Sequence, residues 1–171
     1  YAAGLVVTAL ENGADGFMFS VSETTLSILR IIREKKEKAK PNLYAIVPYA
    51  YEYVRLATQA GGVSGLARKV AKEIVVSFNV KAMATGLKAA VSMDTSALLK
   101  TYLTYEISRI RSSAGKKANL ESVLLHEIIT DMALALNLDW LFKSYIDYML
   151  KKRMKAGFET RNFAYLVNKF R

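Results

Sequence analysis

The sequence predicts an α/β domain with a parallel β-sheet, because apolar strands alternate with amphipathic helices along the chain. Residues 15–21 (DGFMFSV) and 42–48 (NLYAIVP) have the length of buried strands, and residues 122–128 (SVLLHEI) form a third. Strands joined through helices pair in parallel. Active sites on parallel sheets lie at the carboxyl ends of the strands. The polar residues that follow each run are therefore the first candidates for a functional site.

The N-terminal part is predicted to contain a helix, a strand and a second helix, in that order. Residues 1–12 carry an apolar stripe at helical spacing and meet Gly13, a residue type that commonly ends helices. Ser22 is the expected N-cap of the second helix, which stops before Pro41. The inward face of this second helix consists of Leu26, Leu29 and Ile32.

Residues 50–113, between the second and third strands, are predicted to form a helix-rich insertion. Asp94 is the expected cap of the last helix in this segment. One face of that helix contains Leu99, Tyr102, Leu103, Ile107 and Ile110. A standard crossover between parallel strands needs only about a dozen residues, so this segment is much longer than the connection requires.

The C-terminal part is predicted to be helical after the third strand. A short helix is expected to end near Asn137, and Asp139 to cap a longer one. Asn162 is expected to cap a last helix that still runs at Arg171. Gly157 is interpreted as a break between helices, so no fourth strand is predicted.

The length and hydrophobic content fit one domain. The chain has 171 residues, of which 52% are hydrophobic, and this suffices for a sizeable core. We expect residues 1–171 to form a single α/β domain that is part of a longer chain. The reasons are that Tyr1 is not an initiator methionine and that both ends fall within predicted helices.

The strand-to-helix order resembles that of a TIM barrel or a related α/β enzyme domain. The resemblance rests on the strands within residues 16–21, 43–47 and 123–127 and covers part of the chain only. It implies a partial or incomplete (β/α) barrel-like parallel sheet with a helix-rich insertion. It implies no particular family, because many unrelated activities share such folds.

The composition favours an anionic partner and excludes several kinds of site. The formal net charge is +10, which suits a small anionic metabolite bearing phosphate or carboxylate groups. Nucleic acid is less favoured, because the basic runs at residues 33–40 and 151–155 have no interleaved aromatic residues for base stacking. The absence of Cys excludes disulfides and thiolate chemistry, and a single His excludes a His-rich metal site. No metal is predicted, and the cofactor is unknown.

Charged residues interrupt every long apolar run, so no membrane association is expected. The start of the chain has no basic-apolar-small signal pattern, and we expect a cytoplasmic protein. Another copy of the chain could cover the apolar ends of the predicted sheet. A homo-oligomer is therefore a further expectation.

The strongest catalytic candidates are His126 and Glu127 at the end of the third strand, with Asp131 one turn further on. Both His126 and Glu127 can reach a pocket only if the strand ends at Leu125, because neighbouring side chains of a strand face opposite ways. A His beside carboxylates suits proton transfer near neutral pH. The alternative is a structural His bonded to the backbone, with Glu127 in an ion pair.

Five other polar residues are candidates for binding a substrate: Ser20, Ser22, Tyr49, Arg161 and Asn162. Ser20 and Ser22 follow the first strand, where the exposed N–H groups of a helix can hold an anion. Arg161 can bind a carboxylate or phosphate through two parallel hydrogen bonds. The alternative roles are helix capping for Ser22 and Asn162, and packing for Tyr49.

These residues predict an enzyme domain that acts on a small anionic metabolite by general acid–base chemistry of the lyase, isomerase or hydrolase type. The alternative is a non-catalytic, basic, helix-rich module that binds nucleic acid or a protein. The two hypotheses differ in whether the polar residues at the strand ends come together.

Overall fold

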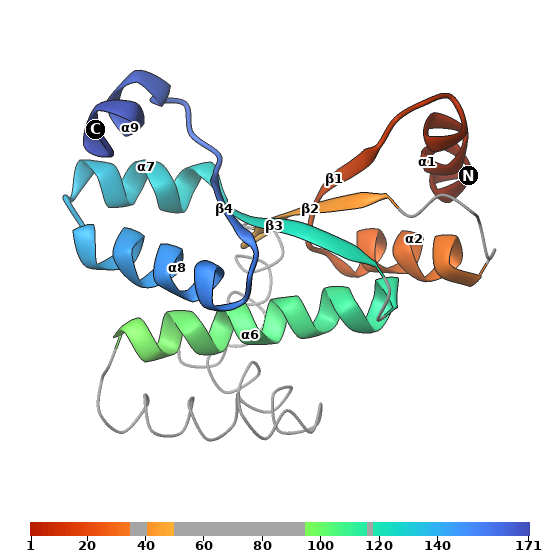
Figure 1. The fold of residues 1–171 in the computed structure, drawn as a ribbon, viewed down its shortest axis with the longest axis horizontal. Coiled ribbons are helices and arrows are strands. Elements are labelled where there is room, and N and C mark those ends of the chain that lie inside the picture. The colour runs from red at the N-terminus through yellow and green to blue at the C-terminus, as the bar shows by residue number, and fades with distance from the viewer. Residues whose placement is uncertain (35–40, 50–94, 116–117) are drawn as a thin grey trace, which may run out of the picture.

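The computed structural model describes residues 1–34, 41–49, 95–115 and 118–171 (Figure 1). The elements in chain order are α1 (Ala2–Glu11), β1 (Gly16–Ser20), α2 (Glu23–Glu34), β2 (Asn42–Val47), α6 (Thr95–Ala114), β3 (Asn119–Leu125), α7 (Glu127–Ala135), α8 (Asp139–Lys151), β4 (Lys155–Phe158) and α9 (Phe163–Lys169). The helices predicted within residues 50–94 lie outside the described residues.

The described strands form one parallel sheet in the order β1-β2-β3-β4. One row of paired residues runs across the whole sheet, from Ser20 through Ile46 and Leu124 to Gly157. The carboxyl ends of the strands are therefore level with one another. The α/β class and the parallel sheet are confirmed, whereas the barrel stays a prediction.

The prediction that no strand follows residue 128 was wrong, because Lys155–Phe158 form β4 beside β3. The strand is stabilised from two sides. The hydroxyl of Ser122 donates a hydrogen bond of 2.8 Å to the carbonyl of Lys155, and the hydroxyl of Tyr145 accepts one of 2.8 Å from the N–H of Gly157. Side chains of β3 and α8 thus hold a segment whose own sequence is a weak strand former.

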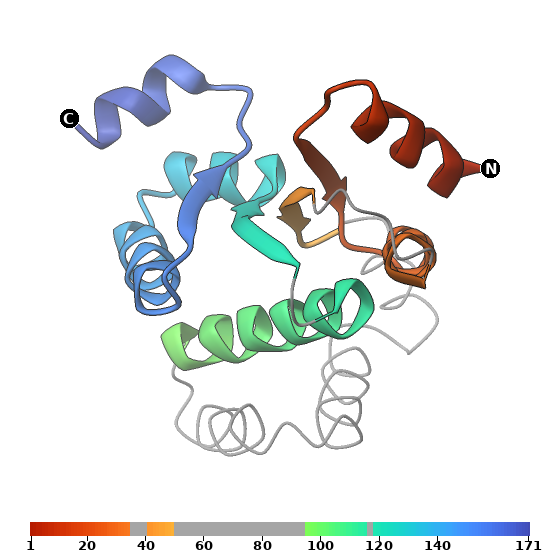
Figure 2. The same cartoon turned by 45° about the vertical axis from the view of Figure 1, so that its right-hand side comes forward.

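The helices α2, α6 and α8 lie on one side of the sheet, as Figure 2 shows. The strand residues on that side are buried with the inward faces of these helices, and they include Phe19, Ala45 and Val123. The residues that α8 contributes to this core include Phe142, Tyr145 and Met149. The stripe of buried residues predicted for α2 is confirmed in full.

Several predicted boundaries differ from the structure. The predicted third strand runs to residue 128, whereas β3 ends at Leu125 and the next helix begins at Glu127. Asp139 is the first residue of α8, and no side chain caps that helix. The last helix ends at Lys169 and does not run to the end of the chain.

The long helix α6 carries a buried ion pair that ties it to α2. The carboxylate of Glu106 is fully buried, and Nη1 of Arg109 lies 3.1 Å and 3.3 Å from its two oxygens. Nη2 of Arg109 donates to Oε1 of Glu23 at 2.9 Å, at the start of α2. This contact holds the pKa of Glu23 below its usual value. Desolvated charges require such partners.

None of the described helices combines the length and the apolar character needed to cross a bilayer.

Candidate functional site at the carboxyl ends of β3 and β4

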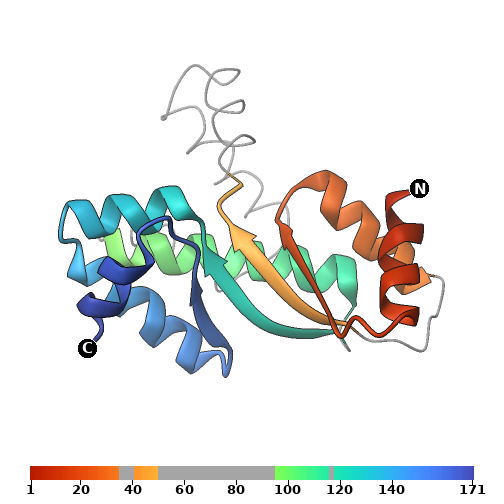
Figure 3. The same ribbon diagram turned by 90° about the horizontal axis from the view of Figure 1, so that it is seen from above.

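The strand β3 ends at Leu125, so His126 and Glu127 lie at its carboxyl edge and not within it. His126 is the N-cap of α7: its ring nitrogen Nδ1 accepts a hydrogen bond of 3.2 Å from the N–H of Ile128. Its own N–H donates to the carbonyl of Val47 at the end of β2, at 2.7 Å. These contacts fix both the backbone and the ring of His126 at the carboxyl end of β3. Figure 3 shows this end of the sheet from above, where β3 leads into α7.

Glu127 forms a bidentate ion pair with Arg161, which lies in the segment after β4. Nε and Nη2 of Arg161 donate to the two carboxylate oxygens at 2.8 Å and 2.7 Å. The guanidinium keeps the pKa of the Glu127 carboxyl below its ordinary value, chiefly through these hydrogen bonds. The same contact raises the pKa of Arg161. Glu127 therefore stays ionised and positions Arg161.

Asp131, on the first turns of α7, holds the same segment. The hydroxyl of Thr160 donates to Oδ1 of Asp131, and the N–H of Arg161 donates to Oδ2 at 3.2 Å. Together with the Glu127 ion pair, these bonds join α7 to the residues that follow β4. The structure thus brings together four of the candidates: His126, Glu127, Asp131 and Arg161.

Glu159 is a further member of this cluster that the sequence did not single out. Its carboxylate oxygen Oε2 lies 4.0 Å from Nε2 of His126 and accepts from the N–H of Glu127 at 3.3 Å. Its N–H donates to the carbonyl of Leu125 at 2.9 Å, which continues the pairing of β3 with β4. Recognition of Lys155–Phe158 as a strand would have identified Glu159 as the first polar residue after a strand end.

Ser22 caps α2 as predicted, and Ser20 is the last residue of β1. Oγ of Ser22 accepts from the N–H of Thr25 at 3.2 Å, and the hydroxyl of Thr25 donates to the carbonyl of Ser20 at 2.7 Å. In the described sheet, β2 and β3 separate β1 from β4. At about 4.8 Å per strand, the serines lie roughly 14 Å along the sheet from the segment after β4.

The other two candidates for binding a substrate are Tyr49, which follows β2, and Asn162, which precedes α9. Tyr49 is partly buried and follows Pro48 at the end of β2. Asn162 is exposed and is the N-cap residue of α9, as predicted, but its side chain makes no cap hydrogen bond. The N–H of Asn162 instead donates to the hydroxyl of Thr160 at 2.9 Å. Both residues stay predictions as substrate contacts.

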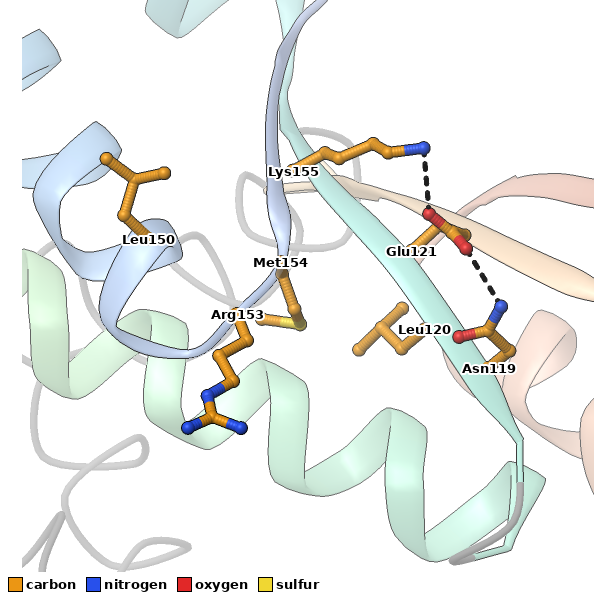
Figure 4. A pocket seen from close by; sticks show the side chains of 7 residues that line it. All are labelled: Asn119, Leu120, Glu121, Leu150, Arg153, Met154 and Lys155. Carbon is orange, nitrogen blue, oxygen red and sulfur yellow. Dashed lines mark hydrogen bonds and ion pairs between the residues drawn. The ribbon is translucent and has the colours of Figure 1, made fainter.

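Two of the cavities in the described part of the chain lie elsewhere. One of about 300 Å³ lies at the amino ends of β3 and β4, and Figure 4 shows its lining: Asn119, Leu120, Glu121, Leu150, Arg153, Met154 and Lys155. Nζ of Lys155 is 3.0 Å from the Glu121 carboxylate there, so both charges are already paired. The other, of about 310 Å³, lies between α8 and α9. The His126 cluster lines neither of them.

The described residues contain no group of three His, Asp or Glu side chains placed to hold a metal ion. Comparisons with protein-family models, with curated proteins and with solved structures gave no match. The interpretation of this site therefore depends on its geometry.

Proposed function

We propose that this protein is an enzyme domain that moves a proton on a small anionic carbonyl compound, with His126 and Glu159 as the reacting pair. One observation carries the proposal: Nε2 of His126 lies 4.0 Å from the Glu159 carboxylate. Both residues follow the aligned carboxyl ends of the neighbouring strands β3 and β4. A proton donor and a proton acceptor at this spacing can contact neighbouring atoms of one bound molecule.

The cap contact of His126 decides which of its nitrogens carries the proton. A neutral imidazole has one N–H donor and one acceptor nitrogen. Because Nδ1 accepts from the Ile128 N–H at 3.2 Å, the proton of the neutral ring is on Nε2. Nε2 then points a donor toward the site, where it can stabilise negative charge that develops on a carbonyl oxygen.

Glu159 is better suited than Glu127 to accept the proton. Both oxygens of Glu127 are bound by Arg161. The Glu159 carboxylate, by contrast, is 39% exposed and receives one N–H through Oε2. In the proposed reaction, Glu159 removes a proton from the carbon next to the carbonyl group, and Nε2 of His126 donates to the carbonyl oxygen. Glu127 and Asp131 position the segment around them.

Arg161 supplies the charge that would hold the anionic group. Its guanidinium is 78% exposed and uses two of its five N–H donors on Glu127. The other donors have no partner among the residues that the structure describes. A carboxylate or phosphate can bind them while Glu127 keeps the guanidinium in place. The net charge of +10 favours the approach of such an anion.

The test is the exchange of carbon-bound hydrogen for deuterium in D₂O, followed by ¹H NMR for pyruvate and dihydroxyacetone phosphate. We expect the protein to accelerate exchange in at least one of them. Glu159→Gln and His126→Gln should each reduce that acceleration by about a hundredfold or more. Arg161→Gln should weaken binding.

The control is Arg33→Gln, because Arg33 lies at the far end of α2 and donates to the carbonyl of Ser112 at 2.8 Å. It should leave the exchange rate unchanged. No acceleration with either compound, or an acceleration that survives Glu159→Gln in a folded protein, would contradict the proposal.

A further inference from the structure

The helices α2, α6 and α8 all lie on one side of the described sheet (Figure 2). On its other side, Met18 is 62% exposed, Tyr44 and Leu124 are partly exposed, and Ile46 is buried. Parallel sheets occur almost entirely with both faces covered. When parallel strands follow one another in sequence order, right-handed crossovers place all the crossover helices on the same side of the sheet. The other face of such a sheet is covered when the sheet closes into a barrel.

A helix with exposed apolar residues precedes β1, and another follows β4. Within the described residues, β1 and β4 each pair on one side only. Leu5 of α1, the helix before β1, is 55% exposed. Phe163 and Tyr165 of α9, which follows β4, are 71% and 52% exposed. Unpaired strand edges and apolar patches of this kind mark surfaces that bind another chain.

The two edges also carry opposite charges at their amino ends. Glu11 and Asp15 are exposed just before β1. The exposed residues Lys151, Lys152 and Arg153 come just before β4. If the β4 edge of one molecule paired in parallel with the β1 edge of another, the amino ends would be aligned, and acidic residues would face basic ones.

We propose that two copies of this chain associate through these edges and close an eight-stranded parallel barrel. The β4 strand of each copy would pair with β1 of the other, with a two-fold axis along the barrel. This closure covers the open face, removes both edges and packs α9 of one copy beside α1 of the second. If something other than a second copy covers this face, the protein stays monomeric.

The closure has a consequence for the candidate site. In one copy, β2 and β3 lie between Ser22 and the segment that contains Glu159 and Arg161. In the closed barrel, Ser22 of the second copy follows the strand that pairs with β4, and so lies next to that segment. The N-terminus of α2 would then face the same mouth as Arg161, so each site would contain residues of both copies. The association itself does not depend on the proposed proton transfer.

The first test measures the mass of the 171-residue chain by light scattering after gel filtration. We expect about twice the chain mass of 19.1 kDa. Asp15→Arg and Lys151→Glu should each raise the dissociation constant of the dimer about tenfold or more, and the double variant should restore it. Arg111→Glu is the matched control, because Arg111 is exposed on α6, a helix on the covered side of the sheet.

The second test uses the absence of Cys from the chain. A short bismaleimide should cross-link Asp15→Cys protein mixed with Lys151→Cys protein, and link neither variant to itself. Circular dichroism would confirm that each variant is folded. A monomer at all concentrations, or a dimer that ignores the charge reversals and links like variants, would overturn the proposal.

Discussion

The hydroxyl of Tyr145, on α8, accepts a hydrogen bond of 2.8 Å from the backbone N–H of Gly157, on β4. The same hydroxyl donates toward the carbonyls of Val123 and Gly157. It therefore joins the crossover helix to both of the strands that carry the His126 cluster. The position of Glu159 and Arg161, which follow β4, depends on this contact.

Replacing Tyr145 with Phe should destabilise the fold by about 1–3 kcal/mol, because buried backbone groups lose their partner. Tyr145 is fully buried, so water cannot replace the hydroxyl. Urea denaturation followed by circular dichroism measures the change. Tyr165→Phe is the control: Tyr165 is 52% exposed, and its change should stay within about 0.5 kcal/mol. Equal effects of the two substitutions would contradict the assigned role.

The stability of the protein should fall at alkaline pH, in part through Tyr145. Burial raises the pKa of this phenol well above its ordinary value. Because the pKa of Tyr145 is higher in the folded state, the protonated phenol stabilises the fold relative to the unfolded chain. This stabilisation is fully present below the unfolded pKa, about 10, and is lost as the pH rises above that value toward the folded pKa. Urea denaturation at several alkaline pH values should show a shallower decline for Tyr145→Phe. Some decline should remain, because burial also raises the pKa of Tyr148.

Gly157→Ala should be destabilising, by about 1–3 kcal/mol, because the sheet has no room for a methyl group there. A Cβ at this position would lie 2.8 Å from Cγ of Leu124 and 2.9 Å from Oγ of Ser122. Gly4→Ala is the matched control, since no atom lies within 4 Å of a Cβ at Gly4, within α1. There, Ala should stabilise the helix by up to about 1 kcal/mol. Thermal unfolding should give shifts of opposite sign.

The Arg161→Gln variant should raise the pKa of Glu127 toward its ordinary value, because the Arg161 hydrogen bonds are the main cause of the lowering. A pH titration of the side-chain carboxyl carbons by NMR measures this. In the wild type, the ion pair between Glu127 and Arg161 stabilises the fold at pH values above the pKa that Glu127 has in the unfolded chain. This stabilisation is lost as the pH falls through the lower pKa that Glu127 has in the folded protein. The pKa of Glu121 should not change, since Lys155 is the chief cause of its lowering.

The sequence was sufficient for the parallel sheet, because strong apolar runs indicate buried strands. The predicted third strand, residues 122–128, extends three residues beyond the end of β3 at Leu125, so the sequence alone left open whether His126 and Glu127 lie within the strand or at its edge. Asp131 was also identified, because it lies about one helical turn after Glu127 on the same helix.

The fourth strand and Glu159 could not be predicted, because residues far away in the sequence determine them. Lys155–Phe158 is a short segment with Ala and Gly, both poor strand formers. It becomes a strand through the Tyr145 and Ser122 hydroxyls and through pairing with β3. Tertiary contacts therefore override its local preference. The bidentate contact between Glu127 and Arg161 likewise depends on β4.

The most direct test of the proposed site is the protonation pattern of the His126 ring, because His126 is the only histidine in the chain. Long-range ¹H–¹⁵N NMR of ¹⁵N-histidine-labelled protein distinguishes the two nitrogens of a neutral imidazole. The structure predicts the proton on Nε2 and a lone pair on Nδ1, which the Ile128 N–H occupies. A neutral ring with its proton on Nδ1 would show that no donor faces Glu159, and the proposed proton transfer would be wrong.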